Sequence, residues 1–162
     1  MKKYRVGLVI GRFQPFHLGH KYLLEKALEY CDEIIVGIGS SNVTNENNPY
    51  SFETRKKFVD EFIKKSKIEA RISKIIYIED VPDDRDWLDL LLKKTGKVDV
   101  EIGDNEWTNG IFENAQIPVV RIGHYKREIL EGVKIRNNMK NKLDWKDRVP
   151  EYLVKYIEKN SR

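Results

Sequence analysis

Short apolar runs of strand length alternate along this chain with segments that have the periodicity of a helix. The runs predicted to form buried strands are 4–10, 33–38, 75–78, 98–102 and 118–122. At the i, i+3, i+4, i+7 spacing of an amphipathic helix stand Leu24, Ala27, Leu28 and Cys31. The alternation predicts an α/β fold, with a Rossmann-like parallel sheet flanked by helices and joined by right-handed crossovers.

The remaining segments complete this predicted organisation. The polar stretch 40–48 is predicted to be a loop, and further helices are expected to begin at 49–52 and at 87–92. From about residue 132 the chain is predicted to be mostly helical. A chain of 162 residues without repeats or low-complexity segments is expected to form one domain over 1–162, whose helical C-terminal part begins at about 132.

Charge and composition narrow the class of protein. Thirty Lys and Arg against 26 Asp and Glu leave a net charge of +4, which suits anionic ligands but does not require nucleic acid, so no nucleic-acid partner is expected. The single cysteine excludes an intramolecular disulfide and fits a reducing compartment. No apolar run approaches the roughly 20 residues of a membrane span. We therefore expect a cytoplasmic protein without a membrane partner.

The segment from Gly11 to His20, G-R-F-Q-P-F-H-L-G-H, lies between the first predicted strand and the helix that follows it. In a parallel sheet this is where a strand's carboxyl end and a helix N-terminus form a phosphate site. Arg12 offers a planar fork for phosphate oxygens. If the helix begins near Leu18, His17 and His20 lie on adjacent edges of its first turn. The segment therefore predicts an anion site.

The chemistry of this segment has three interpretations. As phosphate ligands, the two imidazoles would be adjustable donors that a phosphate draws toward the cationic form, and Gly19 would leave room for the phosphate against the backbone. A zinc site would need carboxylates as well, because the chain has three histidines and one cysteine. The residues could also be ordinary turn residues, but the surrounding strand, arginine, proline and helix favour the phosphate site.

The segment 11–20 resembles the signature of the H-x-G-H nucleotidyltransferase superfamily, and the chain most closely resembles the archaeal-type nicotinamide-nucleotide adenylyltransferases. The segments similar to that family's motifs are I-I-V-G-I-G-S at 34–40, N-P-Y-S-F-E-T-R at 48–55, I-E-D at 78–80 followed by Trp87, G-D-N at 103–105, G-V-K-I-R at 132–136 and D-W-K-D-R-V-P at 144–150. The first motif is common to the superfamily. The segment around Trp87 is what points to a pyridine nucleotide.

The resemblance implies a reaction and a set of site residues. The phosphate of nicotinamide mononucleotide would attack the α-phosphorus of ATP, giving NAD and pyrophosphate without a covalent intermediate. Mg²⁺ would accompany ATP, held by phosphate oxygens and water and by no protein side chain. The family also implies a homo-oligomer. The expected residues are His17, His20 and Arg12 for catalysis; Gly11, Phe13, Gln14, Gly19, Gly132, Ile135 and Arg136 for ATP; and Ser40, Asp80, Trp87 and Asn105 for the nicotinamide nucleotide.

One segment departs from the family pattern. Where the family has S-G-T before x-I-R, this chain has Glu131, Gly132 and Val133. Two hydroxyl donors are therefore missing, and the carboxylate of Glu131 would repel a triphosphate. Either ATP is bound with fewer contacts, or the donor or acceptor differs from the family's usual pair.

The acceptor is the least constrained part of the hypothesis. Trp87 begins an apolar helical stripe with Leu90 and Leu91, so pattern alone favours a core position, whereas the resemblance favours a platform for the pyridine ring. Trp107 and Trp145 are interpreted as packing residues. Two other functions stay open: a sister nucleotidyltransferase that acts on a flavin, pantetheine or polyol phosphate, possibly with CTP, and a non-catalytic nucleotide-binding module.

Overall fold

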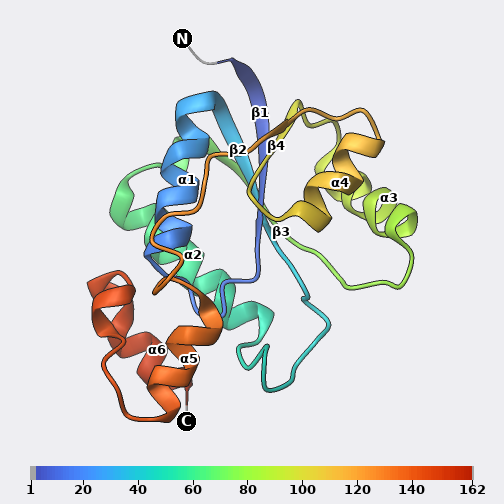
Figure 1. Cartoon of the computed structure of the whole chain (residues 1–162). Helices are drawn as coiled ribbons and strands as arrows, with labels where there is room; N and C mark the ends of the chain where they lie inside the picture. Colours follow the sequence, from blue (N-terminus) through green and yellow to red (C-terminus); the bar gives the residue numbers. More distant parts are fainter. Residues whose placement is uncertain (1–2, 162) are drawn as a thin grey trace.

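A computed structural model describes residues 3–161, which form a parallel sheet between two layers of helices (Figure 1). The strands are β1 Tyr4–Gly11, β2 Cys31–Ile38, β3 Ile72–Tyr77, β4 Val100–Ile102 and β5 Val119–Val120. The helices are α1 Leu18–Tyr30, α2 Phe52–Ser66, α3 Asp84–Thr95, α4 Glu106–Asn114, α5 Gly132–Lys140 and α6 Val154–Asn160. Short 3₁₀ turns lie at Glu69–Arg71, Lys146–Arg148 and Glu151–Leu153.

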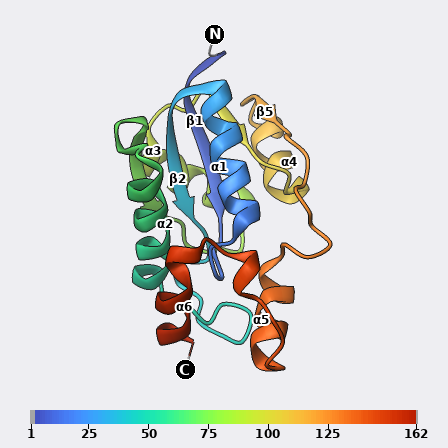
Figure 2. The ribbon, with the colours of Figure 1, turned by 90° about the vertical axis from the view of Figure 1, so that its left-hand side faces the viewer.

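The strand order is β3-β2-β1-β4-β5, and every pair is parallel. The chain therefore moves outward from β1 in one direction through β2 and β3, and then returns to the other side of β1 through β4 and β5. Helices α1 and α2 cover one face of the sheet, and α3 and α4 cover the other (Figure 1). Helices α5 and α6 lie at the end of the sheet where the strands finish (Figure 2). The predicted α/β fold with a parallel sheet is confirmed.

Each face of the sheet has its own core, because successive residues of a strand point to opposite faces. Val9 of β1 packs in the cluster that contains α1 and α2, whereas its neighbour Leu8 packs in the cluster that contains α3 and α4. The first cluster also contains Phe16, just before α1. Anchoring β1 on both sides fixes the position of the segment that leaves its carboxyl end.

Two predicted boundaries are wrong. Cys31 does not end the first helix but begins β2, because the chain turns directly from Tyr30 into the strand. The guanidinium of Arg71 supports this abrupt change by donating to the carbonyls of Leu28 and Cys31, both at 2.7 Å. The third helix begins at Asp84, ahead of the apolar stripe, because the side chain preceding it caps the helix.

The predicted strands and the loop otherwise lie near their expected places. The last strand is much shorter than expected, since only Val119–Val120 pairs with β4. Within residues 3–161, every helix is too short or too polar to cross a membrane.

Candidate functional site

A cavity of about 360 Å³ lies at the carboxyl ends of β1 and β4. At this point the strand order reverses, which is where open α/β sheets bind their ligands. The predicted site residues that line the cavity are Gly11, Arg12, Phe13, Gln14, His17, Gly19, His20, Asn105, Gly132 and Arg136. The predicted residues outside its lining are Ser40, Asp80, Trp87 and Ile135. The structure therefore brings the expected ATP and catalytic residues together, apart from Ile135, which is completely buried in the core.

The turn after β1 is held by aromatic packing. Phe13 has a left-handed backbone with φ of 52°, and its ring is buried and stacked on Phe16 with centroids 5.7 Å apart. A Cβ on Gly11 would lie 2.8 Å from the Phe13 ring, so only glycine fits beneath it. The ring of His20 packs 4.6 Å from that of Phe13. The turn thus presents the start of α1 from a rigid base.

The two histidines cap α1 through one ring nitrogen each. Nδ1 of His17 accepts from the backbone N–H of Gly19 at 3.0 Å, and Nδ1 of His20 accepts from the backbone N–H of His17 at 3.1 Å. This is the geometry of a capping box. Because Nδ1 accepts in both rings, a neutral ring carries its proton on Nε2. Both imidazoles therefore keep an Nε2–H donor for a ligand.

The histidines are held in the neutral form. Burial lowers the pKa of His17 to about 4, against which the nearby charge of Glu131 acts only weakly. Burial, and then the neighbouring His17, hold the pKa of His20 well below its ordinary value. A buried pair with 3.8 Å between ring centroids disfavours charge, so the rings are neutral in this ligand-free structure. That a bound phosphate draws them toward the cationic form stays a prediction.

The glycine between the histidines has a steric role. A Cβ on Gly19 would lie 2.7 Å from Cε1 of His17 and 2.9 Å from its Nδ1. Any larger residue would push the imidazole off the helix end and break the cap. That Gly19 also leaves room for a phosphate against the backbone stays a prediction.

Two arginines are fixed by backbone carbonyls, Arg136 in the cavity lining and Arg55 outside it. Nη1 of Arg136 donates to the carbonyl of Gln14 at 2.6 Å. Arg55, which sequence reasoning did not single out, is completely buried and donates to the carbonyls of Arg12 at 2.9 Å and Gly39 at 2.6 Å. It thereby joins the ends of β1 and β2. Burial, followed by the charge of Arg12, lowers the pKa of both guanidinium groups, which nevertheless stay protonated.

Gln14, predicted to bind ATP, has a mainly positioning role in this structure. Its side chain is buried, donates to the carbonyl of Tyr50 at 3.2 Å and accepts from the Tyr50 N–H at 3.0 Å. Its own carbonyl receives Arg136. Both ends of the side-chain amide are therefore used within the protein, and Gln14 ties the turn to the segment before α2.

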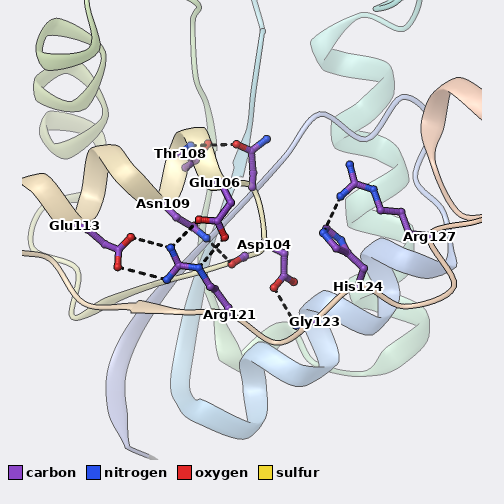
Figure 3. A network of polar contacts seen from close by, with 11 residues as sticks. Asp104, Glu106, Thr108, Asn109, Glu113, Arg121, Gly123, His124 and Arg127 are labelled. Atoms are coloured by element: carbon purple, nitrogen blue, oxygen red, sulfur yellow. Dashed lines mark hydrogen bonds and ion pairs between the residues drawn. The ribbon is translucent and has the colours of Figure 1, made fainter.

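The segment that departs from the family pattern lies on the rim of the cavity. Glu131 precedes α5 without capping it, and its carboxylate pairs with Arg127 at 2.6 Å and Lys134 at 3.9 Å. The hydrogen bond from Arg127 lowers the pKa of Glu131. The charge expected to repel a triphosphate is therefore compensated by neighbours that sequence reasoning missed. Nη1 of Arg127 also lies 2.7 Å from Nε2 of His124 (Figure 3).

The other predicted polar residues form contacts beside the cavity. Oγ of Ser40 donates to Oδ1 of Asp80 at 3.0 Å, which joins the segments after β2 and β3. The side chain of Asn42 bonds the backbone of Asp80 twice, at 2.8 and 3.1 Å. Asn105 caps α4 by accepting from the N–H of Thr108 at 3.1 Å. Asn105 therefore caps α4 and also lines the cavity wall.

Two tryptophans are buried and one is exposed, and the exposed one is not the one that the resemblance indicated. Trp87 is 5% exposed and packs in the core against α4, as its pattern indicates. Trp107, interpreted from sequence as a packing residue, is 56% exposed, with its ring edge-to-face on Trp87 at 5.5 Å between centroids. Trp145 is buried, as expected. An accessible indole face in this region therefore belongs to Trp107.

One further lining residue has no counterpart in the sequence prediction. Glu101, in the middle of β4, is 2% exposed, and its Oε2 makes no hydrogen bond within residues 3–161. Burial is the main cause that raises its pKa to about 8. Sequence reasoning missed it because a single acidic residue in an apolar run usually faces solvent.

Comparison with known proteins gives the family. The model of the family described as Cytidylyltransferase-like matches residues 8–138. Nicotinamide-nucleotide adenylyltransferase of Halorubrum lacusprofundi is 30% identical over 94% of this chain and 85% of its own length. The enzymes of the same name from Archaeoglobus fulgidus and Methanosphaerula palustris are 31% and 34% identical, over 92% and 91% of this chain and 88% and 87% of their own.

Solved structures show the same fold. The bifunctional NMN adenylyltransferase/ADP ribose pyrophosphatase of Francisella tularensis, in complex with AMP and a manganese ion, superposes with a TM-score of 0.79 at 24% identity. The match covers 96% of this chain and 49% of that protein, so the chain spans about half of the bifunctional enzyme. Plasmodium falciparum nicotinic acid mononucleotide adenylyltransferase gives 0.68 at 16% identity, over 98% and 96% of the two chains.

The family model spans most of the chain, including the histidine pair and the start of α5, and the archaeal relatives match over nearly all of it. The resemblance inferred from the sequence motifs is thereby confirmed. The chain belongs to the cytidylyltransferase-like family of nucleotidyltransferases, within which it groups with the archaeal nicotinamide-nucleotide adenylyltransferases.

Proposed function

We propose that the chain transfers the adenylyl group of ATP to nicotinamide mononucleotide, giving NAD and pyrophosphate. The observation that carries this proposal is the pair of Nε2–H donors of His17 and His20 at the N-terminus of α1, beside the β1–β4 switch point. The chain that carries them is 30–34% identical to archaeal nicotinamide-nucleotide adenylyltransferases. The chemistry of the site fits this reaction.

The reaction needs positioning more than acid–base chemistry. An oxygen of the acceptor phosphate attacks the α-phosphorus of ATP, and the bond from that phosphorus to the oxygen bridging to the β-phosphate breaks. The electron pair leaves with pyrophosphate. A phosphate monoester has a second pKa of about 6, so the attacking group is largely dianionic at pH 7 and requires no general base. The protein must hold two anions together and stabilise the charge on the leaving group.

The lining residues supply that stabilisation in two forms. The neutral imidazoles of His17 and His20 are oriented by their own caps, so no reorganisation is needed when charge develops. Positive charge comes from Arg12 and Arg136 at the cavity, and the dipole of α1 adds a partial positive charge at its N-terminus. We assign the triphosphate to this end of the cavity.

ATP enters this proposal as its magnesium complex, so the metal is part of the substrate. Residues 3–161 contain no cluster of three or more His, Cys, Asp or Glu side chains that could hold a metal ion. Asp104 accepts from the N–H of Gly123 at 2.9 Å, and Glu131 is paired with Arg127. We therefore assign the cation to phosphate oxygens and water.

We place the nicotinamide nucleotide beside the cavity, over the ends of β2 and β3. Ser40 and Asp80 are already joined there, and Asn105 lines the adjoining wall. The exposed face of Trp107 is the platform we assign to the flat pyridinium ring, with Trp87 supporting it edge-to-face.

The test is a pyrophosphate-release assay with MgATP and a panel of phosphate monoesters. Nicotinamide and nicotinic acid mononucleotides are compared with FMN, phosphopantetheine and glycerol phosphate, and CTP replaces ATP in a parallel series. We expect turnover with the pyridine nucleotides and ATP. Turnover with another acceptor or with CTP would establish a sister nucleotidyltransferase, and a folded protein without turnover on any pair would refute the enzymatic proposal.

A further inference from the structure

Glu101 is the most unusual polar group that the proposed reaction leaves unused. Its strand β4 lies between β1 and β5, and Glu101 is in register with Leu8 on one side and Val119 on the other. The residue is 2% exposed and lines the cavity, yet its Oε2 has no hydrogen-bond partner in residues 3–161. Buried polar atoms in folded proteins are nearly always paired, so this exception requires an explanation.

The neighbouring charges do not provide the missing partner. Arg121, the cation whose charge acts on Glu101, is directed to two exposed carboxylates instead, Glu106 at 2.7 Å and Glu113 at 2.8 Å (Figure 3). Asp104 accepts from the backbone of Gly123. The carboxyl group of Glu101 thus faces one cation that is already paired and three further acids. Burial, reinforced by those acids, raises its pKa to about 8, so the group is mainly neutral at pH 7 and can both donate and accept.

The position of Glu101 indicates which part of a nucleotide it meets. In the proposed binding mode the triphosphate lies at the start of α1, beyond the end of β1, and β4 is the strand next to β1 on this side. The cavity continues from there along Glu101, Gly103 and Asn105 at the end of β4, which is the space it leaves for the sugar. Oε1 of Glu101 is close to Gly103 at the same strand end, 3.0 Å from the place a Cβ would take there. A larger residue at 103 would separate the carboxyl group from the cavity.

We infer that Glu101 is a specificity-determining residue whose carboxyl group hydrogen bonds a ribose hydroxyl of the bound nucleotide. A hydroxyl is small enough to reach a nearly covered carboxyl group and offers the donor and acceptor that Glu101 lacks. Acidic residues near strand ends bind ribose hydroxyls in other Rossmann-type sheets by the same chemistry. The inference rests on the proposed function for the identity of the nucleotide, and both substrates contain a ribose.

The test compares Glu101→Met, which keeps the volume without polar atoms, with Glu101→Gln, which keeps a neutral donor and acceptor. Glu113→Gln is the matched control, since Glu113 lies near the same Arg121 but is exposed. KM is measured for ATP, 2′-deoxy-ATP and 3′-deoxy-ATP at saturating nicotinamide mononucleotide. Loss of one neutral hydrogen bond predicts that Glu101→Met raises KM for ATP about 3- to 10-fold. KM for the deoxynucleotide that lacks the contacted hydroxyl should change little.

The variants also separate recognition from folding. Glu101→Gln should keep KM for ATP within about 2-fold of wild type, whereas Glu101→Met should lose recognition and yet gain thermal stability, because it removes an unpaired buried polar group. An increase in KM for nicotinamide mononucleotide alone would assign the contact to the acceptor's ribose. Equal changes in KM for ATP and both deoxynucleotides, or no change in any of these constants, would overturn the inference.

Direct binding keeps this result independent of turnover. Calorimetric titration of wild type and Glu101→Met with ATP and each deoxynucleotide needs no acceptor. Discrimination in binding without turnover on any acceptor would support the ribose contact and refute the proposed reaction. The reverse result is turnover with nicotinamide mononucleotide, equal binding of all three nucleotides to both proteins, and an unchanged KM for the acceptor. It would support the proposed reaction and refute the ribose contact.

Discussion

Replacing Glu101 by glutamine should stabilise the folded protein, and by an amount that increases with pH. The residue is 2% exposed within a parallel sheet, and its Oε2 has no hydrogen-bond partner within residues 3–161 that would stabilise the ionised form. Burial is the main reason that its pKa is raised to about 8. Glutamine has nearly the same shape and hydrogen-bonding groups as the neutral acid, but it never has to hold a proton. The comparison therefore isolates the cost of keeping Glu101 protonated.

The sign and magnitude follow from proton linkage. An acid with a higher pKa in the folded state binds its proton more tightly there, so its stabilisation is complete below the ordinary pKa of 4.5 and is lost as pH rises through about 8. The whole displacement corresponds to about 5 kcal/mol, because one pKa unit is worth about 1.4 kcal/mol. At pH 7 the wild-type protein should already have lost about 3 kcal/mol relative to the glutamine variant.

The assay is urea unfolding followed by far-UV circular dichroism, at intervals from pH 5 to pH 9. The free energies of unfolding of wild type and Glu101→Gln should differ by about 1 kcal/mol at pH 5 and by more than 4 kcal/mol at pH 9. Glu113→Gln should show no such growing difference, since its carboxylate is exposed and paired with Arg121. A constant difference for Glu101→Gln across this range would refute the reasoning, because it would mean that the buried carboxyl group does not titrate as the geometry requires.

The other predictions concern the reaction. His17→Asn should leave the free energy of unfolding almost unchanged, since asparagine also caps helices. It should lower kcat about 100-fold through loss of the Nε2–H donor. An unchanged kcat in a steady-state assay would exclude His17 from the phosphate site. Glu131→Ser combined with Val133→Thr should lower KM for ATP several-fold, because the rim loses a negative charge and gains two hydroxyl donors, and a higher KM would contradict the placement of this segment. Trp107→Ala should raise KM for nicotinamide mononucleotide about 5-fold or more while KM for ATP stays constant. Trp87→Phe should mainly lower the melting temperature. The opposite pattern would assign the platform for the pyridine ring to Trp87.

Local sequence was sufficient for the parts of the molecule that are set by short-range rules. The first strand, the helix beginning at Leu18 and the anion site between them follow from periodicity, one glycine and two helix-capping side chains within 15 residues. The boundary at Cys31 could not be predicted in the same way. Its apolar side chain continues the helical stripe, and the change to a strand is supported by Arg71, 40 residues away, which donates to the carbonyls of Leu28 and Cys31.

Long-range packing explains the site residues that the sequence did not reveal. Arg55 lies in a helix that would place it on the surface as readily as in the interior, and its burial depends on the carbonyls at the ends of β1 and β2. Glu101 is buried because β4 lies between two other strands, which is a property of the strand order. The exposure of Trp107 likewise depends on Trp87 already filling the core against α4.

The protonation state of the histidines determines how the site must balance charge. Burial lowers the pKa of His17 to about 4 and holds the pKa of His20 well below its ordinary value, so before a nucleotide binds the two imidazoles bring hydrogen-bond donors to the site but no net positive charge near pH 7. The positive charge must therefore come from guanidinium groups. Arg136 is held at the cavity by a backbone carbonyl and forms no ion pair within residues 3–161, whereas Arg127 is paired with Glu131. A triphosphate that attracts Arg127 must compete with that carboxylate, so the ion pair on the rim weakens ATP binding without abolishing it. The same pair keeps Arg127 close to the cavity in the absence of nucleotide, which accounts for a glutamate at a position where a hydroxyl would be the simpler ligand.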